Sequence, residues 1–184
     1  MNRVLLVGEC NPYGADPFFA LYHLPRNASG NRLREHLGLT DVEYHKLDKV
    51  NLCTGKWSLP KAREHAFALI DAGNYNVMVL LGRKVRDAFG DPPPFEWGSA
   101  RGVKLVGLPH PSGLNRAWLE PDARAQAVAV LTEVAPDVPW RAPGARCPSI
   151  SSQGLTCKLP IGHEGQHCAL METAAAIPAK EENR

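Results

Sequence analysis

The residues best suited to chemistry stand in two loops, each of which follows a short apolar run. The first loop reads Gly-Glu-Cys-Asn-Pro-Tyr-Gly at residues 8–14, and the second reads Leu-Pro-His-Pro-Ser-Gly-Leu-Asn-Arg at residues 108–116. Glu9 could polarise a water molecule, whereas the amide of Asn11 could only orient one. A neutral His110 could donate a hydrogen bond to negative charge that develops as a bond breaks. The alternatives are a solvated loop carboxylate and an ordinary Pro/Gly turn with an incidental histidine.

The elements that must position these loops follow from the hydrophobic pattern. Apolar runs predict buried strands at residues 4–7, 77–81 and 103–106, and residues 44–52 predict a weaker strand. Capping and periodicity predict helices at residues 29–37, 58–72, 82–86 and from residue 121 onward. This alternation predicts a three-layer, doubly wound α/β fold with a mostly parallel, four-stranded sheet. Because ligands bind beyond the carboxyl ends of such strands, we expect both loops and Asn51 to meet at one edge.

Length and composition are typical of one medium-sized domain with an appendage. The 184 residues are enough for an independent core, and a net charge of +2 leaves nucleic-acid binding to a local patch. No apolar stretch has the length of a membrane span or of a signal peptide, so we expect a cytoplasmic monomer without a membrane partner.

Together the two loops resemble those of the uracil-DNA glycosylase superfamily. In that family a Gly-x-Asp/Asn-Pro or Gly-Glu-x-Pro loop follows the first strand, and a His-Pro-Ser or Asn-Pro-Ser loop follows the last. The most specific match is His110-Pro111-Ser112, and the first loop is a hybrid of the two family types; the likeness covers residues 3–135. The resemblance implies a DNA glycosylase of base excision repair, which hydrolyses the N-glycosidic bond of uracil or a related pyrimidine in damaged DNA. The alternative is a nucleic-acid or nucleotide binding module that uses the same fold without cutting.

The resemblance implies a role for each polar side chain. His110 would stabilise the departing base, and either Glu9 or Asn11 would direct the attacking water. Asn51 matches the family's asparagine that reads the edge of the flipped base, although a turn asparagine is the alternative. The side chain that stacks on the base has several candidates, which are Phe18, Phe19, Tyr22 and Arg26, and Tyr13 is expected to be a further substrate-binding residue.

The second loop also carries the residues that the family uses on the DNA duplex. Leu114 resembles the apolar wedge that fills the space left by a flipped base. The neighbouring side chains of Ser112, Asn115 and Arg116 could then hold the phosphates around it.

The C-terminal part of the chain contains a different set of chemistry-bearing residues. We expect the glycosylase-like domain at residues 1–136, a Pro-rich linker at 137–146, a Cys/His motif at 147–172 and a disordered tail at 173–184. In the motif, Cys147, Cys157, His163 and His167 are the ligand set that a structural zinc ion accepts, with a disulfide as the alternative use of the cysteines. No cysteine precedes the first strand, so we expect no iron–sulfur cluster of the kind some relatives contain.

Overall fold

The computed structural model describes residues 2–11, 19–90, 92–120 and 122–142, together with two short strands at residues 156–157 and 171–172. The chain divides into two compact units, Met1–Pro143 and Gly144–Arg184. Across these described segments, every helix is too short or too polar to cross a membrane.

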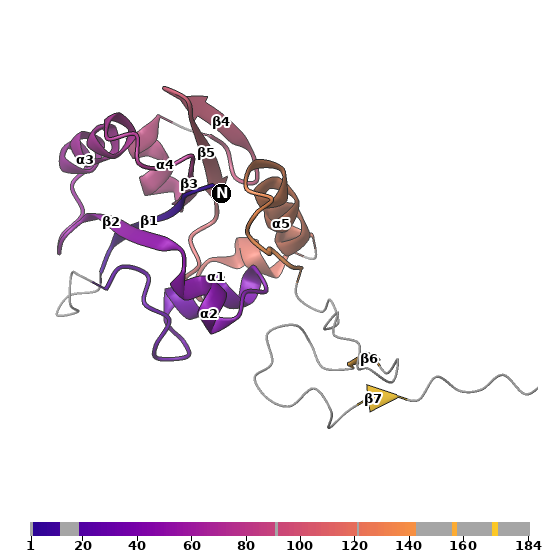
Figure 1. The fold of residues 1–184 in the computed structure, drawn as a ribbon. Coiled ribbons are helices and arrows are strands. Elements are labelled where there is room, and N and C mark those ends of the chain that lie inside the picture. Colours follow the sequence, from indigo (N-terminus) through magenta and orange to yellow (C-terminus); the bar gives the residue numbers. More distant parts are fainter. Residues whose placement is uncertain are drawn as a thin grey trace, which may run out of the picture. The chain divides into compact units, whose positions relative to one another are not determined.

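The N-terminal unit is built on a five-stranded sheet in the order β2-β1-β3-β5-β4 (Figure 1). Its strands are β1 (Val4–Cys10), β2 (Asp48–Cys53), β3 (Val77–Leu81), β4 (Trp97–Ala100) and β5 (Val103–Leu108). All neighbours are parallel except β4, which pairs antiparallel with β5. Every side chain of the central strand β3 is buried, as expected for a strand that is covered on both faces.

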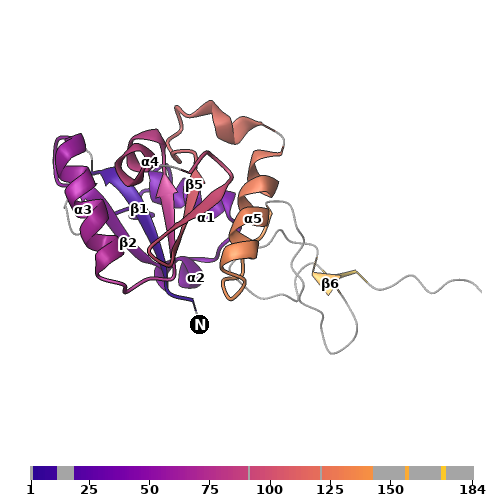
Figure 2. The same ribbon diagram turned by 90° about the horizontal axis from the view of Figure 1, so that it is seen from above.

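Helices cover both faces of the sheet (Figures 1 and 2). They are α1 (Ser29–His36), α2 (Asp41–His45), α3 (Leu59–Asp71), α4 (Arg83–Phe89) and α5 (Ala123–Val134), with a 3-10 helix η1 (Arg116–Leu119) before α5. Alternating side chains of β3 separate the two cores, because Val79 and Leu81 pack with α1, α2 and α5 whereas Met78 and Leu80 pack with α3 and α4. The predicted α/β fold with a mostly parallel sheet is therefore confirmed.

The predicted number of four strands is wrong, because β4 adds a fifth at the edge of the sheet. Its sequence, Trp-Gly-Ser-Ala, is short and half-exposed, and it lacks the apolar run on which the strand prediction depended. β4 joins β5 through Arg101 and Gly102, which both have positive φ angles of 49° and 82°. Such a two-residue loop matches the twist of a tight hairpin, and Gly102 was the available signal for it.

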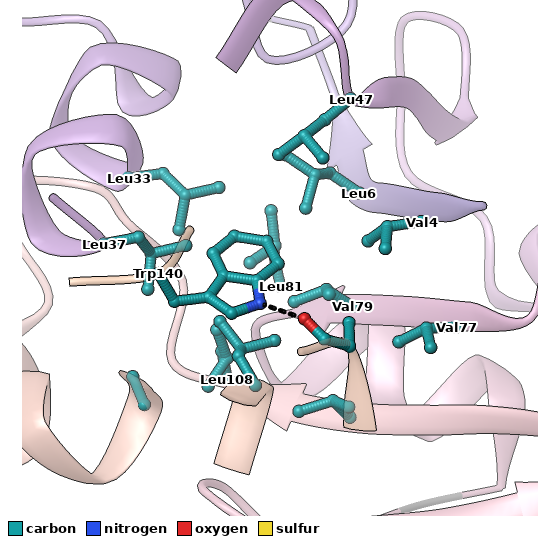
Figure 3. Close-up of a cluster of buried hydrophobic side chains, with 14 of the residues drawn as sticks. Val4, Leu6, Leu33, Leu37, Leu47, Val77, Val79, Leu81, Leu108 and Trp140 are labelled. Carbon is teal, nitrogen blue, oxygen red and sulfur yellow. Dashed lines mark hydrogen bonds between the residues drawn. The ribbon is translucent and has the colours of Figure 1, made fainter. Parts of the chain in front are cut away.

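Residues at the start of the expected linker pack against the domain instead of leaving it. Trp140 lies among Leu33, Leu37, Leu81 and Leu108 in the core beneath α1 and α5 (Figure 3). Its indole N–H donates to the carbonyl oxygen of Ala135 at 2.9 Å. Arg141 continues this packing: both of its terminal nitrogens donate to the carboxylate of Glu43, at 2.7 and 2.8 Å. The folded domain thus extends through residue 141.

In the part of the C-terminal unit that the structure describes, β6 (Thr156–Cys157) and β7 (Met171–Glu172) pair antiparallel, and Cys157 opposes Met171. Of the predicted zinc ligands, only the backbone of Cys157 belongs to the described residues. Cys147, His163 and His167 lie outside them, as does the expected tail at 173–184.

Candidate active site

A cavity of about 590 Å³ opens at the carboxyl ends of β1 and β2, where the sequence predicts the site. It brings together four of the predicted side chains from three separate segments, Glu9, Asn11, Asn51 and His110. The remaining wall is largely apolar and comes from the segment before α1 and from the start of that helix, with Phe19, Leu21, Tyr22, Leu24 and Pro25 among the lining residues. An apolar cavity with a few convergent polar groups is the usual form of a small-molecule or base-binding site.

The imidazole of His110 is held in one defined tautomer. Its Nδ1 accepts a hydrogen bond from the backbone N–H of Ser112 at 3.1 Å, so a neutral ring carries its proton on Nε2. Burial lowers the pKa of His110 below its ordinary value of 6.5, against the opposing effect of the Glu9 carboxylate. At neutral pH His110 is therefore an uncharged hydrogen-bond donor.

The backbone of His110 is fixed by two further side chains. Its carbonyl oxygen accepts from Asn115 Nδ2 at 3.0 Å and from the indole N–H of Trp118 at 3.2 Å. Asn115 also caps η1, because its Oδ1 accepts from the backbone N–H of Ala117 at 3.1 Å. Trp118 is itself held by His36, whose ring stacks on the indole with a centroid separation of 4.5 Å. The predicted phosphate contact Asn115 thus holds the His110 loop in place.

Glu9 faces α4 and is paired there. The observed strand β1 extends beyond the predicted end at residue 7, so Glu9 belongs to the strand and not to the loop after it. The side chain of Glu9 lies on the same face of β1 as those of Leu5 and Val7. Its Oε2 accepts from Lys84 Nζ at 2.9 Å, and this contact raises the pKa of Lys84. The lysine on α4 therefore fixes the orientation of a carboxylate in the cavity wall.

Gly82 explains how Glu9 and His110 come close to each other. It has a φ angle of 97°, and a Cβ atom on it would lie 3.0 Å from His110 Cβ and 3.4 Å from Glu9 Oε1. A side chain at this position would be strained and would push the two groups apart. The absence of a side chain after β3 is thus a condition for the site.

The two amides of the cavity are joined directly. Asn51 Nδ2 donates to Asn11 Oδ1 at 2.6 Å, across the parallel pair formed by β1 and β2. Asn51 stands opposite Gly8 in this register, and a Cβ atom on Gly8 would collide with Asn51 Oδ1. Asn51 lies within β2, two residues before the strand ends at Cys53.

Two of the predicted stacking residues line the cavity. Phe19 and Tyr22 are 57% and 44% exposed, and their rings contact each other with centroids 5.4 Å apart. The two ring planes are tilted by 47° to each other, so the pair offers two accessible aromatic faces instead of one flat surface. Tyr13 and Phe18 lie outside the described residues, and Arg26 is exposed but does not line the cavity.

The loop after β5 presents its other predicted residues to solvent. Leu114 is 95% exposed, which is unusual for a large apolar side chain, and Arg116 is exposed beside it. Ser112 is half-buried, and its backbone N–H donates to the His110 ring. The guanidinium of Arg32 lies against Gly113, within 2.8 Å of the position of a Cβ atom there, so a cation from α1 adjoins the exposed leucine.

Sequence reasoning missed four residues of this site, which are Arg32, Gly82, Lys84 and Trp118. In the sequence Lys84 stands only within the helix predicted at residues 82–86, and Trp118 belongs to no predicted motif. Among the described residues, no cluster of three or more His, Cys, Asp or Glu side chains could hold a metal ion. Comparison with protein-family models and with curated proteins finds no match to the sequence.

Proposed function

We propose that this protein is a DNA glycosylase, which hydrolyses the N-glycosidic bond of uracil or a related pyrimidine in DNA during base excision repair. The observation that carries the proposal is the state of His110, a neutral donor with its Nε2–H available in the wall of a cavity. Glu9 and the Asn11–Asn51 pair line the same cavity. A base-excising enzyme needs these groups in one pocket, which receives the flipped base.

The reaction would begin when the flipped base enters the cavity and its bond to C1′ of the sugar lengthens. The electron pair of that bond passes to the base, and negative charge collects on the base oxygen. His110 would donate from Nε2 to this oxygen, and such preorganised donors contribute about 10²–10³ in rate. The sugar develops positive charge, which the carboxylate of Glu9 would offset.

Water completes the reaction by forming a bond from its oxygen to C1′. Glu9 could take up the proton of this water, while the Asn11–Asn51 amide pair orients it or reads the base edge. Glu9 Oε2 is held by Lys84, whereas Oε1 lies toward Gly82 and His110. Oε1 is therefore the oxygen that we assign to the water. The departing base anion takes up a proton from solvent and Glu9 releases its proton to solvent, so the products are the free base and an abasic sugar.

One observation favours the second candidate, a module that binds a base or nucleotide without cutting it. Glu9 Oε2 already has the ammonium of Lys84 as its partner at 2.9 Å, so one of the two carboxylate oxygens is engaged within the protein. Binding and cutting make different demands on His110, because its donor bond to a developing anion forms chiefly in the transition state.

The test is incubation with oligonucleotides that each carry one defined base lesion, followed by alkaline cleavage of abasic sites. We expect excision of uracil or a related pyrimidine by the wild-type protein. In His110→Ala, we expect turnover to fall by about 10²-fold or more while DNA affinity stays nearly unchanged. Equal losses of turnover and affinity would make His110 a binding residue, and binding without any excision would favour the non-catalytic module.

We also propose that the C-terminal motif holds a structural zinc ion through Cys147, Cys157, His163 and His167, since two thiolates and two imidazoles suit tetrahedral zinc. The purified protein should then contain about one equivalent of zinc, and a chelator should increase proteolysis after Arg146 without abolishing base excision. Absence of zinc together with blocked thiols would favour a disulfide instead.

A further inference from the structure

A second cavity lies beside the candidate active site, at the carboxyl end of β2. We call it the lysine cavity, and its volume is about 340 Å³. It is lined by Leu52, Cys53, Thr54, Lys56, Trp57, Ser58 and Lys61. Cys10 and Cys53 oppose each other in the register of β1 and β2. Since Cys10 lines the candidate active site and Cys53 lines the lysine cavity, the two cavities open at the same ends of neighbouring strands.

The chemistry of the lysine cavity is that of an anion site. Its lining combines two ammonium groups, from Lys56 and Lys61, with the hydroxyls of Thr54 and Ser58, and it contains no carboxylate. Lys56 and Lys61 are exposed, and neither forms an ion pair with any residue of the described segments. The charge of both lysines is therefore available to a ligand.

Trp57 adds an aromatic surface and connects the lysine cavity to the candidate active site. The indole is half-buried and packs on the same apolar cluster as Cys10. Lys84 Nζ lies 5.8 Å from the centroid of the Trp57 ring and 2.9 Å from Glu9 Oε2. A single ammonium thus contacts the carboxylate of one cavity and the aromatic ring of the other.

We propose that the lysine cavity is a second nucleic-acid subsite, which binds the phosphodiester and the base of a nucleotide adjacent to the one whose base enters the candidate active site. The inference rests on the proposed function of the main cavity. Proteins that bind single strands combine cations, which track the backbone, with aromatic side chains, on which bases stack. Lys56, Lys61 and Trp57 supply both parts within one cavity.

This subsite matters because the protein has little general attraction for nucleic acid. The net charge of the whole chain is only +2, so strand binding depends on local clusters of cations. A subsite on the β2 side would also hold the strand at the opposite end from the exposed Leu114 loop, which follows β5; two strands, β1 and β3, lie between β2 and β5. The substrate would then be a strand that is held unpaired on at least one side of the flipped nucleotide.

The test compares three proteins by fluorescence anisotropy with an undamaged single-stranded 12-mer over a series of salt concentrations. They are the wild type, the double variant Lys56→Ala/Lys61→Ala, and the control Lys46→Ala/Lys104→Ala, which removes two lysines from outside both cavities. Each lost phosphate contact on a single strand should reduce the slope of log affinity against log salt by about 0.7. We expect a reduction of about 1.4 in the double variant and none in the control. Trp57→Ala should weaken binding about tenfold, and Trp57→Phe should restore part of this loss.

The outcomes separate this proposal from the proposed function. If the wild type excises bases and the double variant keeps the wild-type slope and KM, the lysine cavity is not a subsite but the glycosylase stands. If the slope falls as expected and no lesion is excised, the subsite stands and the catalytic function fails. A competition assay with thymidine monophosphate tests whether the same lysines bind a free mononucleotide. If thymidine monophosphate binds as tightly as the 12-mer, and loses affinity equally in the double variant, the site is one for free nucleotides and the strand proposal is overturned.

Discussion

Asn115 offers the sharpest test of how the candidate active site is held together. The sequence predicts that it contacts phosphate, whereas both ends of its amide bind within the protein. Replacement by alanine removes the cap of η1 and one of the two donors to the carbonyl oxygen of His110. Replacement by aspartate keeps an oxygen that can cap η1, but removes the donor to His110. The two variants therefore separate the role in stability from the role in positioning.

The magnitudes follow from these contacts. Loss of a helix cap costs about 1 kcal/mol, and loss of one neutral hydrogen bond costs about 1 kcal/mol. For a domain of this size each kcal/mol lowers Tm by about 4 °C, so Asn115→Ala should unfold about 4–8 °C lower. Asn115→Asp should recover roughly half of this loss. Because Trp118 still donates to the His110 carbonyl, we expect turnover to fall only about tenfold in both variants.

The assay pairs thermal unfolding with single-turnover excision and with DNA binding at one salt concentration. If Asn115 positions His110, turnover should fall in both variants while the Kd for DNA stays within about twofold of wild type. A Kd that rises in both variants with turnover unchanged would refute the reasoning, because it would show that Asn115 binds phosphate as its sequence context suggests.

Three further predictions concern protonation, water and the domain boundary. Glu9→Gln should reduce turnover far more than Asn11→Ala if the carboxylate takes the proton of water, and the single-turnover rates will rank them. Burial lowers the pKa of His36 to about 4, below its unfolded value of 6.5, so the unfolded state binds more protons and stability is lost as pH falls from 6.5 toward 4. Between pH 7 and 5 this loss should be about 1 kcal/mol after allowance for partial exposure, and it should vanish in His36→Phe, measured by denaturant unfolding. A chain ending at residue 139 should unfold at least 10 °C lower than one ending at residue 142, which keeps the buried Trp140; equal Tm values would contradict the packing of that segment.

Much of the fold could be predicted from the sequence, because buried parallel strands carry continuous apolar runs. Val77–Leu81 is such a strand, and its predicted and observed bounds agree. β4 could not be predicted in this way, since an edge strand needs no apolar face and its four residues are half-exposed. Trp140 and Arg141 were assigned to a linker because Pro139 and Pro143 stand beside them. Their burial depends on α1 and α2, which are about a hundred residues earlier in the chain.

The sequence predicts which segments meet at the candidate site, but it does not predict which contacts hold them together. Strand ends in a parallel sheet share one edge, so Glu9, Asn11, Asn51 and His110 could be expected to converge. The tautomer of His110 was not predictable, since it depends on the local path of the backbone through Ser112. Long-range contacts such as the one from Lys84 to Glu9 have no local signature in the sequence.

The order of the strands explains why the residues after β3 have such influence on this site. β3 lies between β1, which carries Glu9, and β5, which leads to His110. The residues that follow β3 must therefore lie between Glu9 and His110. Gly82 occupies this position without a side chain, and both Glu9 Oε1 and His110 lie within 3.4 Å of the point where its Cβ atom would be. Two residues later, on the first turn of α4, Lys84 reaches back to Glu9 Oε2. The central strand thus determines both the separation of the carboxylate from the imidazole and the charge beside them, although no residue of β3 itself lines the cavity.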